Sequence, residues 1–226
     1  MPFQIDLEKY KIIDLAKEVV PNLLDPGDRP FVIEESRLGD GTYKFDIRQT
    51  HTHVGTHVES PWHYYHEGKT ITDFPLEHFM GRARLLRAAP SPGAGSMTLA
   101  MIQEQLEAHR GAFEILLMRN DSGKTPLRVE MEAVPYIRDL KIKLLIFEAG
   151  IEFGEGVEDG RKFHDLLMSR DICLVEFPEQ CRELDRDAFY IFALPMRVKG
   201  LDSAMCRLMA VVERYTGGLG DWGTGR

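Results

Sequence analysis

The run His53-Val-Gly-Thr-His57-Val-Glu59-Ser-Pro-Trp-His63 holds three of the chain's eight histidines together with one carboxylate. Imidazole and carboxylate groups are ligands that borderline divalent metals such as zinc prefer. All four side chains lie at odd positions, so an extended segment would place them on one face. The run therefore predicts a metal site on a strand or a strand-like loop.

The same spacing also allows a helix, because positions 53 and 57, and positions 59 and 63, are four residues apart. Three β-branched residues within the run, together with Gly55 and Pro61, disfavour that alternative. A straight strand would separate residues 53 and 63 by roughly 33 Å, a span that ligand bonds near 2.0–2.3 Å cannot bridge. We therefore expect bends at Gly55 and Pro61. A set of histidines with ordinary hydrogen bonds is the remaining alternative, which this clustering disfavours.

A second pair of residues could complete the site. His164 lies in a predicted helix, and Glu176 ends the following strand, where active-site groups of α/β folds commonly gather. The neighbours of Glu176 are apolar, so its carboxylate would be costly to bury without a cation. The alternative is an exposed helix histidine and a glutamate just beyond a strand. The pair by itself leaves both alternatives open.

The rest of the chain predicts a mixed α/β domain. Alternating runs at 31–36 and 42–49 flank a Gly39-Asp40-Gly41 turn signal and predict a hairpin. Further strands are expected at 82–88, 113–118, 143–147, 172–177 and 189–194, and helices at 99–109, with Thr98 as N-cap, 129–140 and 161–169. We expect one domain over residues 1–216 and a glycine-rich tail over 217–226.

Composition excludes several classes of partner. The 226 residues are enough for one large domain, and the net charge of −8 gives no reason to expect nucleic acid or an anionic membrane. No apolar run approaches the ~20 residues that span a bilayer, and the charged first residues do not resemble a signal peptide. Cys173, Cys181 and Cys206 indicate reduced, mostly buried thiols. We therefore expect a cytoplasmic protein that acts on a small molecule.

Residues 53–63 resemble the His-x-Gly-Thr-His-x-Asp-x-Pro-x-His signature of the cyclase family of metal-dependent hydrolases. That family includes bacterial-type kynurenine formamidase and isatin hydrolase. The likeness covers nearly the whole chain, since it extends to Asp14-Leu15, Pro26-Gly27-Asp28 and the Pro195…Gly200…Asp202…Arg207 stretch. The resemblance implies a swivelling β/β/α fold. It also implies a homodimer or homotetramer in which a neighbouring subunit helps to line the pocket.

Position by position, the resemblance implies a role for each site residue. His53, His57 and Glu59 match ligands of a first metal ion. Glu59, His164 and Glu176 match ligands of a second, with Glu59 bridging the two. His63 resembles the acid–base histidine of the family. Zinc is the metal of the binuclear members, and manganese is the alternative, since isatin hydrolase resembles a case with one manganese ion.

Two positions depart from the family pattern. Glu59 stands where the signature has aspartate, and its longer side chain leaves the number of metal ions open. Asp25 stands where kynurenine formamidases carry a tryptophan before Pro-Gly-Asp, which argues against kynurenine formamidase itself. Trp62, beside His63, could supply a different aromatic wall.

We therefore expect a metal-dependent hydrolase of an amide, cyclic imide or lactone, using metal-activated water and His63 as proton carrier. One alternative is a metal-dependent cyclase or lyase that uses the same site. The other is a non-catalytic metal- or ligand-binding protein on the same fold, which the retained His63 disfavours.

Overall fold

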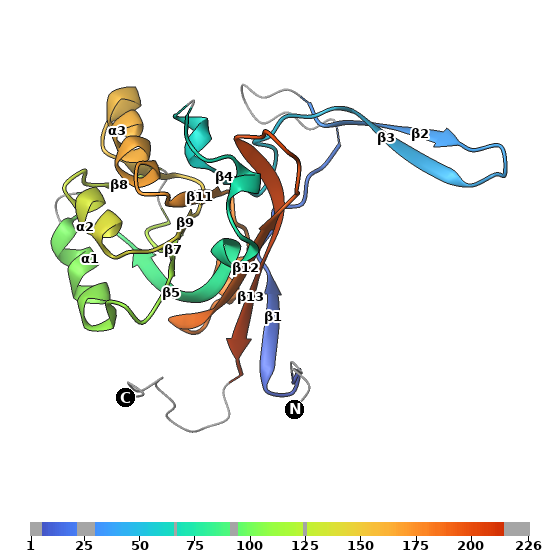
Figure 1. Cartoon of the computed structure of the whole chain (residues 1–226). Coiled ribbons are helices and arrows are strands. Elements are labelled where there is room, and N and C mark those ends of the chain that lie inside the picture. Colours follow the sequence, from blue (N-terminus) through green and yellow to red (C-terminus); the bar gives the residue numbers. More distant parts are fainter. Residues whose placement is uncertain (1–5, 22–29, 66, 91–94, 124–125, 215–226) are drawn as a thin grey trace.

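Strands buried on both faces form the centre of the molecule. The computed structural model describes residues 6–21, 30–65, 67–90, 95–123 and 126–214 (Figure 1). In β7 (Ile115–Asn120), the side chains of Ile115 and Leu117 join one buried cluster, whereas those of Leu116 and Met118 join another. Such uninterrupted apolar runs are typical of parallel strands that are covered on both sides.

These strands belong to an eight-stranded mixed sheet in the order β1-β13-β12-β5-β7-β9-β11-β4. An additional pairing of β13 with β4 closes the sheet into a ring of seven strands, with β1 outside it. Strands β5, β7, β9 and β11 are parallel, and the other pairings are antiparallel. The bounds of the other strands are β1 Tyr10–Asp14, β4 His57–Glu59, β5 Met80–Ala88, β9 Leu144–Phe147, β11 Cys173–Glu176, β12 Ala188–Pro195 and β13 Ser203–Glu213.

Three helices cover the parallel part of the sheet from one side (Figure 1). They are α1 (Leu99–Leu106), α2 (Ala133–Asp139) and α3 (Gly156–Met168). The predicted N-cap is confirmed, because the Thr98 hydroxyl accepts a hydrogen bond from the backbone N–H of Met101 at 3.4 Å. A small parallel sheet accompanies the helices and consists of β10 (Ile151–Phe153), β8 (Leu127–Val129) and β6 (Ser96–Met97).

A hairpin of β2 (Val32–Arg37) and β3 (Tyr43–Gln49) extends away from this body (Figure 1). Its two strands form a separate two-stranded sheet, and the hairpin predicted from the turn signal is confirmed. Because the β2–β3 hairpin extends away from the rest of the molecule, its side chains are more exposed than those of the central strands.

The mixed α/β class expected from the sequence is confirmed, but several boundaries differ. The helix expected over 129–140 begins only at Ala133, because Val129 pairs with Phe153 in the small sheet. The helix expected over 161–169 begins at Gly156. Strand β13, eleven residues long, was not predicted, because most of its residues, among them two alanines and two methionines, have no strong β propensity. Its formation depends on pairing with three other strands.

Some expectations fall on residues that are not described. The tail at 217–226 and the motif Pro26-Gly27-Asp28 with its neighbour Asp25 lie outside the described residues. The boundary at residue 216 therefore stays a prediction. Among the helices of the described residues, none is both long and apolar enough to cross a membrane.

Candidate metal centre

Two bends bring the ends of the histidine run together. Only His57–Glu59 is strand, and it pairs with β11 on one side and β13 on the other. Gly55 adopts a φ of +62°, a left-handed conformation that favours glycine, and a Cβ there would lie 2.5 Å from Val19 Cγ2. Pro61 begins a 3₁₀ helix that ends at His63. The bends expected at Gly55 and Pro61 are therefore present, while the strand is shorter than the run suggested.

The first candidate ligand group consists of His53, His57 and Glu59, with one ligand atom of each within 4.8 Å of the others. Glu59 Oε1 lies 2.8 Å from His53 Nδ1 and 3.5 Å from His57 Nε2. His57 Nδ1 donates a hydrogen bond to the carbonyl oxygen of Gly55 at 2.8 Å. That bond leaves the lone pair of His57 on Nε2, which faces the group, as a metal ligand requires.

The second candidate group joins Glu59 to His164 on α3 and Glu176 at the end of β11. His164 Nδ1 donates to the carbonyl oxygen of Gly160 at 2.6 Å, and its Nε2 lies 3.8 Å from Glu59 Oε2. Only 18% of the His164 side chain and 22% of the Glu176 side chain are exposed. His164 is therefore not an exposed helix histidine, and Glu176 lies within its strand rather than beyond it.

Glu59 lies between the two groups and presents a different oxygen to each. Oε1 faces His53 and His57, while Oε2 faces His164. Oε2 is buried and has no hydrogen-bond partner among the described residues. Burial opposes the charge on Glu59, but its interactions with the neighbouring His53 and His57 rings outweigh burial and lower the pKa of this carboxyl far below its usual value. A buried, ionised carboxylate with an unpartnered oxygen is costly unless a cation is near, so these residues fit a divalent metal.

The other charges of the site depend on Glu59. Burial, followed by repulsion from Glu59, raises the pKa of Glu176 to about 7. Burial opposes a charge on His53, yet Glu59 and Asp202 outweigh it and raise the pKa of His53 to about 9. Burial lowers the pKa of His164. Glu59 is thus ionised over a pH range in which the neighbouring Glu176 still holds a proton. A divalent cation would reduce the repulsion between the two carboxylates and let both ionise.

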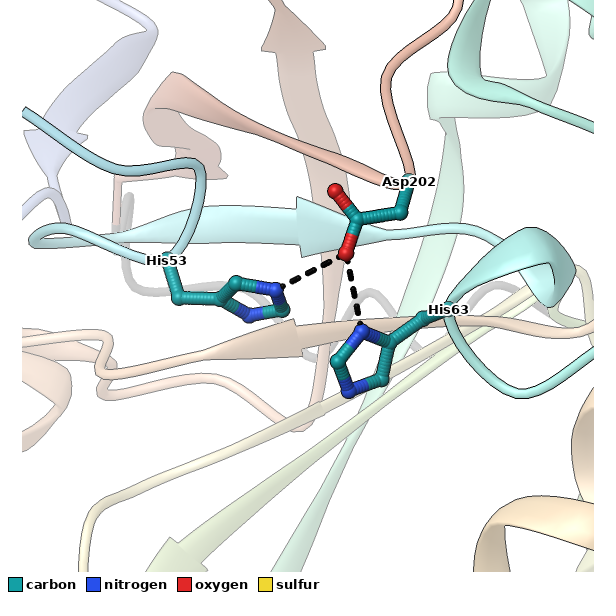
Figure 2. A group of neighbouring side chains, drawn as sticks. All are labelled: His53, His63 and Asp202. Atoms are coloured by element: carbon teal, nitrogen blue, oxygen red, sulfur yellow. Dashed lines mark hydrogen bonds and ion pairs between the residues drawn. The ribbon is translucent and has the colours of Figure 1, made fainter.

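His63 lies at the edge of the site. Its Nε2 is 3.9 Å from Glu59 Oε1, and its Nδ1 is 2.9 Å from Asp202 Oδ2 (Figure 2). Asp202 belongs to the Pro195…Arg207 stretch that resembles the family. The amino-acid sequence did not indicate that this residue has a role in the site. It is 139 residues from His63 along the chain, so no local spacing connects the two.

Tyr64 directly follows His63, and the sequence did not indicate that it lies at the site. Its ring stacks on that of His164 with centroids 4.4 Å apart and planes 10° apart. Tyr64 is 39% exposed, so this residue is partly open to solvent beside His164. The role suggested for Trp62 as an aromatic wall stays a prediction.

The three cysteines are free thiols and buried, as expected. Burial raises the pKa of Cys173 and Cys181 well above the usual thiol value and raises the pKa of Cys206 to about 12. Since the thiolate is the reactive form, none of the three is poised as a nucleophile.

The described residues thus define a class of protein in which a closed mixed sheet carries a candidate metal site, with histidines and a second glutamate around the buried carboxylate of Glu59. The chain belongs to the cyclase family, because its residues 13–150 match the family model described as "Putative cyclase". It is 28% identical over 209 residues to the kynurenine formamidase of Bacillus cereus, an alignment that covers 86% of this chain and 94% of the relative.

Two solved structures share the fold. Isatin hydrolase A from Labrenzia aggregata, bound to benzyl benzoate, superposes with a TM-score of 0.70 and 19% identity, covering 91% of this chain and 94% of that one. A protein from Bacillus stearothermophilus, described as a "predicted metal-dependent hydrolase", superposes with a TM-score of 0.69 and 19% identity. That superposition covers 89% of this chain and 98% of the other.

Proposed function

We propose that the protein is a metal-dependent hydrolase that cleaves the C–N or C–O bond of an amide, cyclic imide or lactone. The observation that carries the proposal is the buried carboxylate of Glu59, with one oxygen facing each of two donor groups and a histidine outside them. The family, and relatives named kynurenine formamidase and isatin hydrolase, support this class of reaction. The buried free thiols support a reducing compartment, so we place the enzyme in the cytoplasm.

The ligands suit zinc first and manganese second, because they combine imidazole with carboxylate and include no thiolate. His53, His57 and Glu59 would hold one ion, and Glu59, His164 and Glu176 would hold another. A bound divalent ion lowers the pKa of water from about 15.7 toward 7 and polarises a carbonyl group. The backbone carbonyls of Gly55 and Gly160 hold two of the histidine rings in the orientation that binding needs.

His63 would move the proton. With its Nδ1 hydrogen-bonded to Asp202, its Nε2 keeps a lone pair that points toward Glu59. This nitrogen can take a proton from the attacking water and pass it to the leaving nitrogen or oxygen of the substrate. Tyr64 is partly exposed and lies beside His63, with ring centroids 5.3 Å apart, so its ring would offer an aromatic contact to a flat substrate.

A panel of formamides, cyclic imides and lactones tests the proposal, assayed with the metal-loaded protein and again after chelation. We expect at least one class to be hydrolysed, with the rate lost on chelation and restored by zinc or manganese. Turnover that survives complete metal removal would contradict the proposal, as would inactivity of the loaded protein toward every class. Incorporation of oxygen-18 from labelled water into the product separates hydrolysis from a cyclase or lyase reaction.

The affinity for metal should rise with pH. In the metal-free protein, a proton stays on Glu176 up to pH about 7 and on His53 up to pH about 9, because the pKa of each group is raised. An incoming ion must displace these protons, so the apparent affinity should increase by about tenfold or more per pH unit between about pH 6 and pH 8.

A competition titration of zinc against a chromophoric chelator, corrected for the chelator's own protonation, measures this dependence. An affinity that is constant or that falls over the same interval would show that these two groups do not bind the ion.

We also propose that two or more copies of the chain associate through the β2–β3 hairpin. Tyr43, Phe45 and Ile47 alternate along β3 and therefore share one face, yet these residues are 59%, 58% and 55% exposed. Glu35 and Arg37 lie opposite Phe45 and Tyr43 and share this face. The other face carries the ion pairs Lys44–Asp46 and Arg48–Glu34. A second copy of the hairpin would cover the apolar face, in keeping with the homodimer or homotetramer expected from the family resemblance.

Phe45→Glu tests this association, because it places a charge within the apolar face. We expect light scattering to give a mass of two or four chains for the unaltered protein and a shift toward the monomer for the variant. Lys44→Ala, on the charged face, serves as the control and should keep the assembled mass. Equal masses for the unaltered protein and Phe45→Glu would exclude this face as the interface.

A further inference from the structure

A single oxygen of Asp202 connects the two ends of the histidine run. Its Oδ2 lies 3.1 Å from His53 Nε2 and 2.9 Å from His63 Nδ1, as Figure 2 shows. The two rings lie side by side, with centroids 4.5 Å apart. His53 is a candidate metal ligand and His63 is the candidate proton carrier. The carboxylate of Asp202 therefore contacts one residue of each kind.

The backbone holds Asp202 in this position. Its carbonyl oxygen accepts two hydrogen bonds from Ser60, one from the backbone N–H at 2.8 Å and one from the hydroxyl at 2.7 Å. The next residue, Ser203, pairs with Glu59 between β13 and β4, and its hydroxyl donates to the carbonyl oxygen of Thr52 at 3.1 Å. Asp202 is therefore fixed to both ends of the run, although its side chain is 29% exposed.

A carboxylate only accepts hydrogen bonds, so both ring nitrogens that face Asp202 must carry hydrogen. In neutral His53, the lone pair then lies on Nδ1, which faces Glu59 and His57. In neutral His63, it lies on Nε2, which faces the interior of the site. Since His57 and His164 keep their lone pairs on Nε2, His53 is the ligand that must bind through the opposite nitrogen.

We propose that Asp202 is a positioning residue that selects the ring tautomers of His53 and His63, making the first a ligand through Nδ1 and the second a base through Nε2. Asp202 also forms a ligand-type group with His53 and His63, but in this proposal it orients the two rings and does not bind the ion. This inference rests on the proposed function only for its activity measurement, since the tautomers and the metal affinity can be measured without a substrate.

Asp202→Asn tests the proposal, because asparagine keeps the shape but replaces the charged acceptor with a neutral amide. At saturating zinc, we expect kcat to fall about tenfold to a hundredfold with KM changed less than about threefold, and zinc affinity to weaken by a similar factor. Asp187→Asn, which removes a carboxylate paired with Arg87 of β5, outside the candidate ligand groups, should change neither quantity. The double variant Asp202→Asn, His63→Ala should be less than about threefold slower than His63→Ala alone.

The measurement that needs no activity is nitrogen-15 NMR of the histidine rings in the zinc-loaded protein. We expect hydrogen on Nδ1 of His63 in the unaltered protein and a shift toward Nε2 in Asp202→Asn. A zinc content below about a tenth of an equivalent in Asp202→Asn would overturn the proposal, because it would identify Asp202 as a ligand. Unchanged tautomers, or rate losses that multiply in the double variant, would overturn it too. If the unaltered protein hydrolyses nothing on the panel, the proposed function fails, while the NMR and affinity measurements still decide the role of Asp202.

Discussion

Glu59→Gln is expected to remove bound metal almost completely, to less than about a tenth of an equivalent per chain after exposure to zinc. Glu59 is the one residue common to both candidate ligand groups, and each of its oxygens faces a different group. Glutamine keeps the length of the side chain but loses the charge that binds the ions. Hydrolysis should fall by at least about a thousandfold, because the pKa of water then returns toward 15.7. Elemental analysis and the substrate panel measure the two losses.

Two other variants separate charge from length. Glu59→Asp, which restores the residue of the family signature, should retain metal because it keeps the carboxylate. Glu114→Gln removes a carboxylate that pairs with Lys143 away from the site, and it should change neither metal content nor rate. Stoichiometric metal in Glu59→Gln would contradict the assignment of Glu59 as the shared ligand.

His63→Ala is expected to keep its metal but to lose at least about a hundredfold in kcat, the scale expected for acid–base catalysis. The reason is geometric: the Nε2 atom of His63 faces the site at 3.9 Å from Glu59, while its Nδ1 is engaged by Asp202. Steady-state kinetics, with metal analysis of the same preparation, provides the measurement.

His109→Ala provides a control, because this histidine lies in the turn after α1, outside the candidate ligand groups. It should leave both metal content and rate unchanged. Loss of metal from His63→Ala would make His63 a ligand rather than a proton carrier, and an unchanged rate would remove it from the mechanism.

The parts of the site that local sequence could predict are those whose chemistry is local. The run from His53 to His63 shows its ligand types and its two bending residues within eleven positions. Glu176 could be recognised because it ends an apolar strand, where a buried carboxylate is costly. The parallel strands were predicted for a similar reason, since burial on both faces leaves a continuous apolar run.

The parts that could not be predicted depend on pairing between distant segments. Strand β13 exists because it pairs with β1, β12 and β4, and its own composition is only weakly β-forming. The same pairing brings Asp202 beside the histidine run. The Gly55 and Gly160 carbonyls that orient His57 and His164 are backbone groups, which no residue type reveals in advance.

Glu59 stands where the family signature has aspartate, so the sequence alone did not decide whether the site binds one metal ion or two. Its longer side chain places Oε1 toward His53 and Oε2 toward His164, which is the arrangement that a bridging carboxylate needs. Glu59 would therefore contribute one oxygen to each of the two candidate ligand groups when metal is bound.

Elemental analysis tests the metal centre most directly. The protein is expressed with ample zinc and manganese and is then freed of loosely bound ions. We expect between one and two equivalents of zinc or manganese per chain, held by His53, His57, Glu59, His164 and Glu176. Less than about a tenth of an equivalent would contradict the account, because the buried carboxylate of Glu59 would then have to be stabilised without a metal ion.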